Sequence, residues 1–316
     1  MSFQLYYASD IHGSDLLWRK FVNAGKFYEV DVLVMGGDIT GKAVVPIVKG
    51  AGGQFTAREV RGARAFGEDE LEAVESAIRD RGFYPYVTDE DELTAVRDTE
   101  GGVDELFGRA MVASVERWMR LAEERLEGTG IKLYVMLGND DEPHLREVLA
   151  ASSLGVDCED EPVELGEGIQ MLSCGHANTT PWNSPREMPE EDLAAHLEAL
   201  AAKLDDPGKA IFNLHVPPKG TAIDQAPKLD ADLKPIVKGG SVEMGAAGSQ
   251  AVRDLIERYQ PPLALHGHIH ESRGTVRIGD TVCINPGSEY GEGVLHGALV
   301  VLDRKKGLRN HQLVSG

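Results

Sequence analysis

The chain has 316 residues and an apolar content of 42%, so it can bury a core as one large α/β domain or as two smaller domains. Its formal net charge is -20 and its pI is near 4.9, and a surface this acidic repels phosphate backbones, which argues against non-specific DNA or RNA binding. A small anionic substrate can still bind where metal ions supply positive charge, because a bound ion dominates the field around it.

Apolar runs alternate with helical patterns along the chain, beginning with a strand at 4–8 and a helix that contains Leu17 and Phe21. The run at 32–35 is wholly apolar, as expected for a sheet that is covered on both faces. Similar short runs recur at 133–137, 169–174, 210–214 and 263–265. This alternation favours an α/β layered domain.

Two further helices are predicted directly before strands. Residues 107–121 place apolar side chains at helical spacing before the run at 133–137, and residues 252–259 do the same before 263–265. We expect Ser249 to be the N-cap of the second of these helices.

One stretch does not fit a compact α/β unit, because roughly 65 residues separate Asp38 from the helix near Leu106 and ordinary connections are far shorter. Its pattern predicts two hairpin strands, a helix and another strand, at 43–48, 54–57, 70–78 and 83–87. The acidic run at 89–92 is expected to be a solvated turn. We therefore predict one domain over 1–316 with an insertion at 43–103, which either caps the active-site side or forms an oligomer contact.

The cysteines and the N-terminal residues indicate the cellular compartment in which the protein is expected. Cys158, Cys174 and Cys283 show no CxxC spacing, which indicates neither a zinc knuckle nor a disulfide framework, and we expect all three to be buried. The N-terminus lacks the features of a signal peptide, and no apolar run is long enough to span a membrane. We expect a cytoplasmic protein that binds neither membranes nor nucleic acid.

Five short blocks of Asp, His and Asn each follow an apolar run, and these residue types are good ligands for divalent metals such as manganese, iron and zinc. The blocks supply seven candidate ligands: Asp10, His12, Asp38, Asn139, His215, His268 and His270. Any one block is common by chance, since a Gly-Asp pair is usually a turn and a single His is usually packed in a loop. Together they favour a site for two metal ions, because functional groups gather beyond the carboxyl ends of strands in an open α/β sheet.

The order of these blocks resembles the calcineurin-like metallophosphoesterase superfamily over most of the chain outside the insertion. Residues 213–218 (NLHVPP), 265–272 (LHGHIHES) and 285–288 (NPGS) resemble the branch related to cyclic-nucleotide phosphodiesterases. The resemblance implies a four-layer α/β/β/α sandwich of two mixed sheets flanked by helices, with two divalent ions at the sheet edge.

The resemblance also implies a role for each ligand and a reaction. Metal 1 would take Asp10, His12 and His270, metal 2 would take Asn139, His215 and His268, and Asp38 would bridge the two. Manganese is the expected metal, with iron, zinc, nickel and cobalt as alternatives. Two such ions, roughly 3.5–4 Å apart, would direct a metal-bound hydroxide at a small phosphodiester or an activated phosphomonoester.

The sequence departs from the superfamily pattern directly after Asn139. Many members have a His there that is thought to protonate the leaving group, whereas this chain has Asp140. Nearby cations favour the ionised form of Asp140, which is a poor acid, while the acidic residues that follow push its pKa the other way. His144 and His176 are the substitute acids, against the alternative that both are ordinary loop histidines. We therefore expect faster turnover of aryl esters and diesters than of alkyl monoesters.

The sequence leaves the roles of several other residues, and two other functions, open. His266 is expected to pack behind the ligands, and the loop at 178–186 either contacts substrate through Trp182 and Arg186 or is structural. A binding or scaffold protein with little catalysis is the alternative function, favoured only by Asp140. A nuclease would need a basic groove, which the net charge of -20 disfavours.

Overall fold

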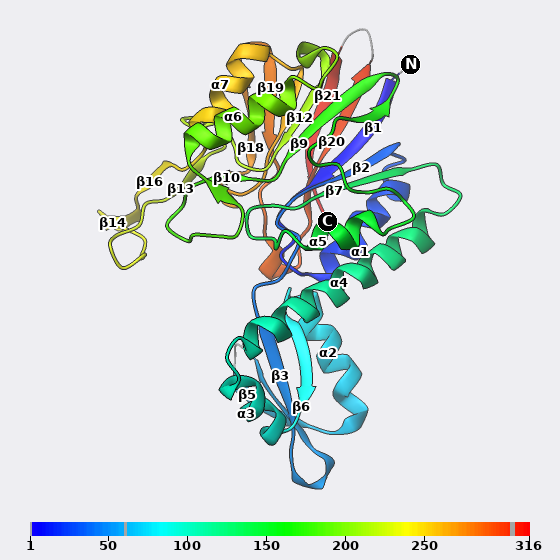
Figure 1. Ribbon diagram of the computed structural model, residues 1–316, viewed down its shortest axis with the longest axis vertical. Coiled ribbons are helices and arrows are strands. Elements are labelled where there is room, and N and C mark those ends of the chain that lie inside the picture. Colours follow the sequence, from blue (N-terminus) through cyan, green and yellow to red (C-terminus); the bar gives the residue numbers. More distant parts are fainter. Residues whose placement is uncertain (1, 60–61, 304–306) are drawn as a thin grey trace.

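A computed structural model describes residues 2–59, 62–303 and 307–316, and two mixed β-sheets pack face to face at its centre (Figure 1). The first sheet has the strand order β21-β20-β1-β2-β7. Its strands in chain order are β1 (Ser2–Ala8), β2 (Val32–Gly36), β7 (Lys132–Met136), β20 (His296–Asp303) and β21 (Gly307–Ser315). The first three run parallel, and β20 and β21 are antiparallel additions on one side.

The second sheet has the strand order β18-β19-β17-β12-β9-β8. Its strands in chain order are β8 (Val163–Gly166), β9 (Ile169–Cys174), β12 (Ile211–Leu214), β17 (Leu263–Leu265), β18 (Gly274–Ile278) and β19 (Thr281–Asn285). The four inner strands are parallel, so their carboxyl ends meet at one edge, and β8 and β18 are antiparallel edges.

Helices cover the outer face of each sheet and complete four layers. The first sheet is covered by α1 (Asp15–Phe27), α4 (Gly102–Leu126) and α5 (Leu145–Ala150), and the second by α6 (Glu190–Ala201) and α7 (Gln250–Tyr259). Strand β1 shows how the sequence produces the layering: Leu5 and Tyr7 join the core between the sheets, whereas Tyr6 and Ala8 join the core beneath the helices. The predicted α/β/β/α sandwich is confirmed.

The elements predicted for the sandwich are confirmed as well. Each apolar run forms the expected strand, and both helical patterns form the expected helices, α4 and α7. Ser249 is the N-cap of α7, because its hydroxyl accepts a hydrogen bond from the backbone N–H of Val252 at 3.2 Å.

The insertion folds around a small core of its own and lies below the sandwich in Figure 1. Its sheet has the order β5-β4-β3-β6, formed by β3 (Val44–Lys49), β4 (Phe55–Glu59), β5 (Gly62–Phe66) and β6 (Tyr84–Thr88). Helix α2 (Leu71–Asp80) packs on it through Val74 and Ile78, which belong to the same buried cluster as Ile47 and Phe55. The predicted hairpin, helix and later strand are therefore present.

The prediction for the acidic run at 89–92 is wrong. Asp89 is the N-cap of α3 (Glu90–Asp98), and its carboxylate accepts a hydrogen bond from the backbone N–H of Glu92 at 2.8 Å. Acidic side chains in the first helical turn interact favourably with the positive end of the helix dipole. A run of acidic residues that is typical of a solvated turn can therefore also form the N-cap and first turn of a helix.

Short elements complete the fold. An arm that projects from the second sheet contains β13 (Gln225–Pro227), β14 (Val237–Lys238), β15 (Ser241–Val242) and β16 (Met244–Ala246). A two-stranded parallel pair is formed by β10 (Ala177–Asn178) and β11 (Glu187–Met188). Single 3-10 turns lie at Ala51–Gly53, Glu68–Glu70, Pro207–Lys209 and Tyr290–Glu292. No helix in the described residues has the length and apolar character needed to cross a membrane, and the three cysteines are buried thiols.

Candidate metal centre

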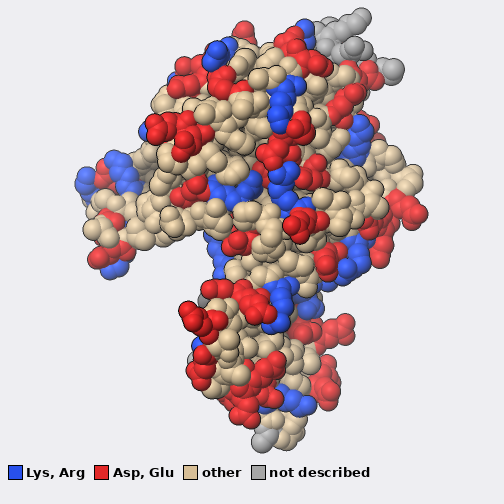
Figure 2. Space-filling model, in the orientation of Figure 1, with Lys and Arg blue, Asp and Glu red and all other residues tan. Residues whose placement is uncertain are grey.

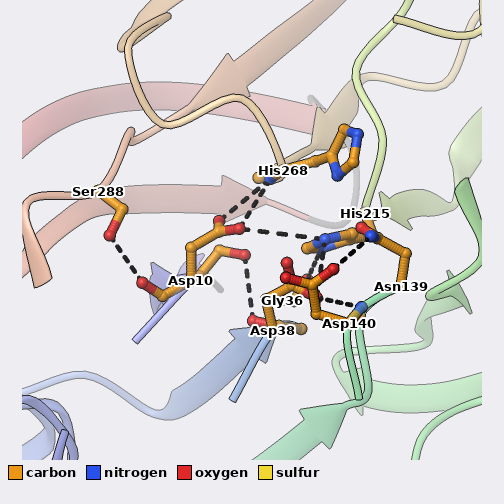
Figure 3. Close-up of polar contacts among 12 residues, drawn as sticks. Asp10, Gly36, Asp38, Asn139, Asp140, His215, His268 and Ser288 are labelled. Atoms are coloured by element: carbon orange, nitrogen blue, oxygen red, sulfur yellow. Dashed lines mark hydrogen bonds and ion pairs between the residues drawn. The ribbon is translucent and has the colours of Figure 1, made fainter. Parts of the chain in front are cut away.

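The seven predicted ligands meet at one end of the sandwich, just beyond the ends of β1, β2, β7, β12 and β17. Backbone hydrogen bonds hold the loops after β1 and β2 together, because the N–H groups of Asp10 and His12 donate to the carbonyls of Gly37 and Asp38, each at 3.0 Å. Figure 3 shows the side chains of Asp10, Asp38 and His215 converging there from different strands.

One cluster consists of Asp10, His12 and His270, whose ligand atoms all lie within 4.8 Å of one another. His12 Nε2 lies 3.0 Å from His270 Nε2, and His270 Nε2 lies 3.4 Å from Asp10 Oδ1. Both oxygens of Asp10 also accept the backbone N–H of His268, at 3.0 and 3.1 Å, which fixes the orientation of the carboxylate.

A second cluster consists of Asp38, His215 and His268, again within 4.8 Å. Asp38 Oδ1 lies 3.3 Å from His215 Nε2, whereas Asp38 Oδ2 lies 3.9 Å from His12 Nε2 in the first cluster. The two oxygens of Asp38 therefore face different clusters, which is the geometry that a bridging carboxylate requires.

Three buried polar atoms in the centre have no hydrogen-bond partner in the described part of the chain: His12 Nδ1, Asn139 Oδ1 and His215 Nε2. His215 Nδ1 lies 2.8 Å from the carbonyl of Gly36 and must carry the proton of that bond, since a carbonyl can only accept. Its Nε2, and Asn139 Oδ1, are then left without a donor. A buried acceptor in that state costs roughly 1–3 kcal/mol, and a cation among these atoms would satisfy both.

For four of the seven side chains, the electrostatics favour the ionisation state that binds a metal. Burial opposes ionisation of Asp10, yet the hydrogen bond from His270 and the charge of His215 lower its pKa to about 2. Burial also opposes ionisation of Asp38, but His215 and His12 hold its pKa well below the usual range. Burial lowers the pKa of His12 to about 3 and that of His268 to about 4, so both imidazoles are neutral at pH 7.

His215 shows the competition between a proton and a cation. Burial lowers its pKa, but the adjacent Asp38 carboxylate outweighs burial and raises it to about 10. A proton on Nε2 therefore stands in for a cation between the two groups.

Several of the candidate ligands have strained backbone conformations. Asp10, His12, Asp38 and His268 have φ values of 58°, 40°, 49° and 65°, in the left-handed region that favours glycine. Such residues cluster at functional sites, where the surrounding structure holds them in place. Position 138 accommodates only glycine, because a Cβ there would lie 2.1 Å from Asp38 Oδ1.

Comparisons with known proteins agree with this architecture. No protein-family model matches the chain. A curated relative, the uncharacterized protein MJ1162 of Methanocaldococcus jannaschii, is 32% identical over 152 residues, which cover 47% of this chain and only 61% of the relative. One solved structure aligns over 99% of both chains with a TM-score of 0.58 and 18% identity. The crystal structure of TT1561 of Thermus thermophilus aligns over 100% of this chain and 99% of its own, with a TM-score of 0.52 and 14% identity.

The two-sheet sandwich with Asp and His clusters at one end decides the fold. The chain has the calcineurin-like metallophosphoesterase fold. Its buried clusters fit the dinuclear metal site of such a fold.

One buried carboxylate that organises this centre was missed in the sequence analysis. Asp141 accepts hydrogen bonds from the backbone N–H groups of Ile39, Thr40 and Gly138 at 3.0, 2.8 and 2.7 Å, and from the Thr40 hydroxyl at 2.5 Å. It thereby joins the loop that carries Asp38 to the loop that carries Asn139. Its position two residues after Asn139 was the available signal.

The three candidate acids lie in different surroundings. Asp140 is at the centre: its backbone N–H donates to Asp38 Oδ1 at 3.0 Å, and its Oδ2 pairs with Lys42 Nζ at 2.9 Å. Burial and the charge of Asp38 raise the pKa of Asp140, against the opposing effect of Lys42. His144 is exposed before α5, and His176 contacts the ring of His196, with centroids 5.3 Å apart.

The loop at 178–186 is held by structural contacts. Arg186 is 5% exposed, and its guanidinium donates to the carbonyl of Leu137 at 2.8 Å and to Glu159 at 2.7 Å. Arg186 therefore has a structural role in this loop. Trp182 is 61% exposed and makes no comparable buried contact in the described residues. The loop also reaches the centre, because Asn139 Nδ2 donates to Ser184 Oγ at 2.7 Å.

Two more features surround the centre. His266 is fully buried and its Nδ1 donates to the carbonyl of Leu214 at 2.8 Å, which agrees with packing behind the ligands. A cavity of about 240 Å³ adjoins Asp140 and is lined by Thr40, Gly41, Lys42, Phe107, Met111, Asp140, Glu142 and Pro185. Part of its wall comes from α4, the helix that follows the insertion.

Proposed function

We propose that the protein is a dinuclear metal-dependent phosphoesterase that hydrolyses a small phosphodiester or an activated phosphomonoester. The observation that carries the proposal is the position of Asp38, whose two oxygens face His215 at 3.3 Å and His12 at 3.9 Å. One buried carboxylate shared by two Asp/His clusters is suited to two adjacent divalent cations.

The proposed ligand sets follow from the two clusters. Asp10, His12 and His270 bind one ion, His215, His268 and Asn139 bind the other, and Asp38 bridges them. Asn139 joins the second set because its buried Oδ1 lacks a donor in the described residues while its Nδ2 is held by Asp140 and Ser184. Manganese suits a mixed set of carboxylate, amide and imidazole ligands.

Two bound divalent ions would neutralise the phosphate and lower the pKa of a water molecule near phosphorus. The chain's own groups then orient the substrate. Lys42 is half exposed beside Asp140 and can contact a phosphoryl oxygen, and the cavity next to it accommodates a leaving group against Phe107 and Met111. The substrate is therefore bound partly by the wall that α4 contributes.

The surroundings of Asp140 support a preference for good leaving groups. Its Oδ1 accepts from Asn139 Nδ2 at 2.9 Å and its Oδ2 from Lys42 Nζ at 2.9 Å, so both oxygens act as acceptors. Burial and the charge of Asp38 raise the pKa of this carboxyl, but neither oxygen is free to carry a proton toward a leaving group while both accept these bonds. Aryl esters and diesters need less help from an acid than alkyl monoesters do.

The charge distribution supports a small substrate over a polynucleotide. On the face drawn in Figure 2, Asp and Glu side chains are interspersed with basic ones over both the sandwich and the insertion. The net charge of -20 adds a general repulsion of long phosphate backbones. A nuclease is disfavoured for this reason.

The experiment that tests the proposal combines metal analysis with a substrate panel. The full chain is stripped with a chelator, reloaded with Mn²⁺ and assayed on aryl and alkyl phosphomonoesters and phosphodiesters. We expect two ions per chain at the Asp/His centre and turnover that requires the metal. Loaded metal without turnover of any substrate would favour the scaffold alternative, and full turnover by the stripped protein would refute the mechanism.

A further inference from the structure

A second group of metal-binding side chains lies outside the centre described above. Cys174 is the last residue of β9, His176 follows two residues later, and His196 comes from α6. One ligand atom from each of the three residues lies within 4.8 Å of the others. The group therefore joins the second sheet to the helix that covers it.

The two histidines leave buried nitrogen atoms without partners. His176 Nδ1 and His196 Nε2 are inaccessible to solvent and have no hydrogen-bond partner in the described part of the chain. Their rings are close to perpendicular, with centroids 5.3 Å apart. Buried polar atoms without a partner are unfavourable, so packing alone accounts poorly for the pair.

The protonation state of His176 suits metal binding, whereas burial of Cys174 opposes the thiolate form that an ion would bind. Burial, together with the charge of Arg186, lowers the pKa of His176 to about 4, so its imidazole is neutral at pH 7 and offers a lone pair. Burial raises the pKa of the Cys174 thiol to about 12, so without an ion the sulfur stays protonated. A bound ion would displace that proton, since metals bind the thiolate.

We propose that Cys174, His176 and His196 form a mononuclear site for a zinc-class cation. One thiolate and two imidazoles form a ligand set typical of tetrahedral zinc, and the fourth position goes to Asp160 or water. Asp160 Oδ1 lies 4.0 Å from His196 Nε2, while its Oδ2 pairs with Arg146. Binding forms one Zn–S bond and two Zn–N bonds and releases the thiol proton to solvent.

This site is distinct from the Asp/His centre. The Cys174 side chain belongs to the core beneath α6 and α7, with Leu193 and Leu197 of α6 as neighbours, and the centre lies beyond the strand ends. The two are linked through the backbone, because the N–H of His215 donates to the carbonyl of Cys174 at 3.0 Å. An ion here would anchor α6 beside the strand that carries His215, which is a structural role.

Cobalt substitution tests the proposal, because the Asp/His centre contains no sulfur ligand. The full chain is stripped with a chelator and titrated with Co²⁺. Thiolate-to-cobalt charge transfer in the near ultraviolet then reports this site alone. We expect the band to saturate at one equivalent, and equilibrium dialysis with Zn²⁺ to give one ion more per chain than the Asp/His centre holds.

Variants separate the proposal from its alternatives. Cys174→Ser should abolish the band and lower the zinc content by one ion per chain, and His196→Gln, at a half-buried helix position, should do so without disturbing the core. The matched controls are Cys158→Ser and Cys283→Ser, which replace the other buried cysteines and should keep the band. Absence of the band in the loaded native chain, or its persistence in Cys174→Ser, would overturn the proposal.

Discussion

Asp38 and His215 come from different sheets of the sandwich and meet at 3.3 Å, with both side chains almost completely buried. His215 Nδ1 is fixed by the carbonyl of Gly36, so its Nε2 must face the carboxylate. A lone pair and a carboxylate held at this distance repel each other unless a proton or a cation lies between them. The contact between the two sheets is therefore coupled to the occupancy of the centre.

Replacing Asp38 by Asn should make the free energy of unfolding independent of Mn²⁺. In the native chain, Mn²⁺ at about 100 times its dissociation constant should add about 2.7 kcal/mol to the free energy of unfolding, because it binds only the folded state. Asp38→Asn removes the bridging charge, so this increment should vanish together with turnover. Thermal unfolding with and without Mn²⁺ measures it, and Asp232→Asn, at an exposed position on the arm, is the matched control.

Asp141 should act by positioning the ligand loops. Asp141→Asn replaces one acceptor oxygen by a donor that faces backbone N–H groups, so the loops carrying Asp38 and Asn139 should separate. We expect metal affinity to fall about 10–100-fold, the range for residues that orient metal ligands. Turnover at saturating Mn²⁺ should recover substantially, which loss of a ligand would not allow. Unchanged metal affinity in a direct titration would contradict this role.

The sandwich was predictable because its strands are short apolar runs buried on both faces, as at residues 32–35. The arm was not, because β13 and β14 contain Pro and Lys and pack against no large core, so no periodicity marks them. The prediction for residues 89–92 was wrong for another reason. Asp89 is the N-cap of a helix, and the residue types that cap helices also form turns.

The convergence of the candidate ligands was predictable because each one follows a strand, and parallel strands bring their ends together. The contacts of Arg186 were not, because its partner Glu159 lies 27 residues away and depends on how two loops pack. The same limit applies to His196, which α6 brings to Cys174 only through tertiary packing. A sequence pattern locates side chains along an element, whereas these pairs depend on the distance between elements.

Replacing Asp140 by His should change leaving-group preference. A neutral imidazole beside Asn139 can donate a proton to a departing alkoxide, and a positioned acid typically contributes about 10²–10⁴-fold. We expect alkyl monoesters to gain more than aryl diesters, so the ratio of their kcat/KM values should rise at least about tenfold. Asp140→Asn, which offers no such proton, is the control. An equal change on both substrate types would contradict the role given to this position.

Lys42 should contribute to substrate binding more than to stability. Its ion pair with Asp140 is half exposed, and such pairs add little to the free energy of unfolding. Lys42→Met should therefore raise KM for anionic esters while the melting temperature stays nearly constant. Lys20→Met, which removes a basic side chain that donates to the carbonyls of Gly293 and Gly316, is a comparison away from the cavity. An unchanged KM would exclude contact between Lys42 and the phosphate.

Arg186 should behave as a structural residue although it lies in the loop next to the centre. Arg186→Met leaves Glu159 buried at 5% exposure without its cation, and breaking a buried pair in this way costs about 3–5 kcal/mol. The double variant Glu159→Gln/Arg186→Met should regain part of that loss, because the uncompensated charge is gone. Chemical denaturation of the single and double variants measures the coupling. A native-like free energy of unfolding with a raised KM would instead assign Arg186 to substrate binding.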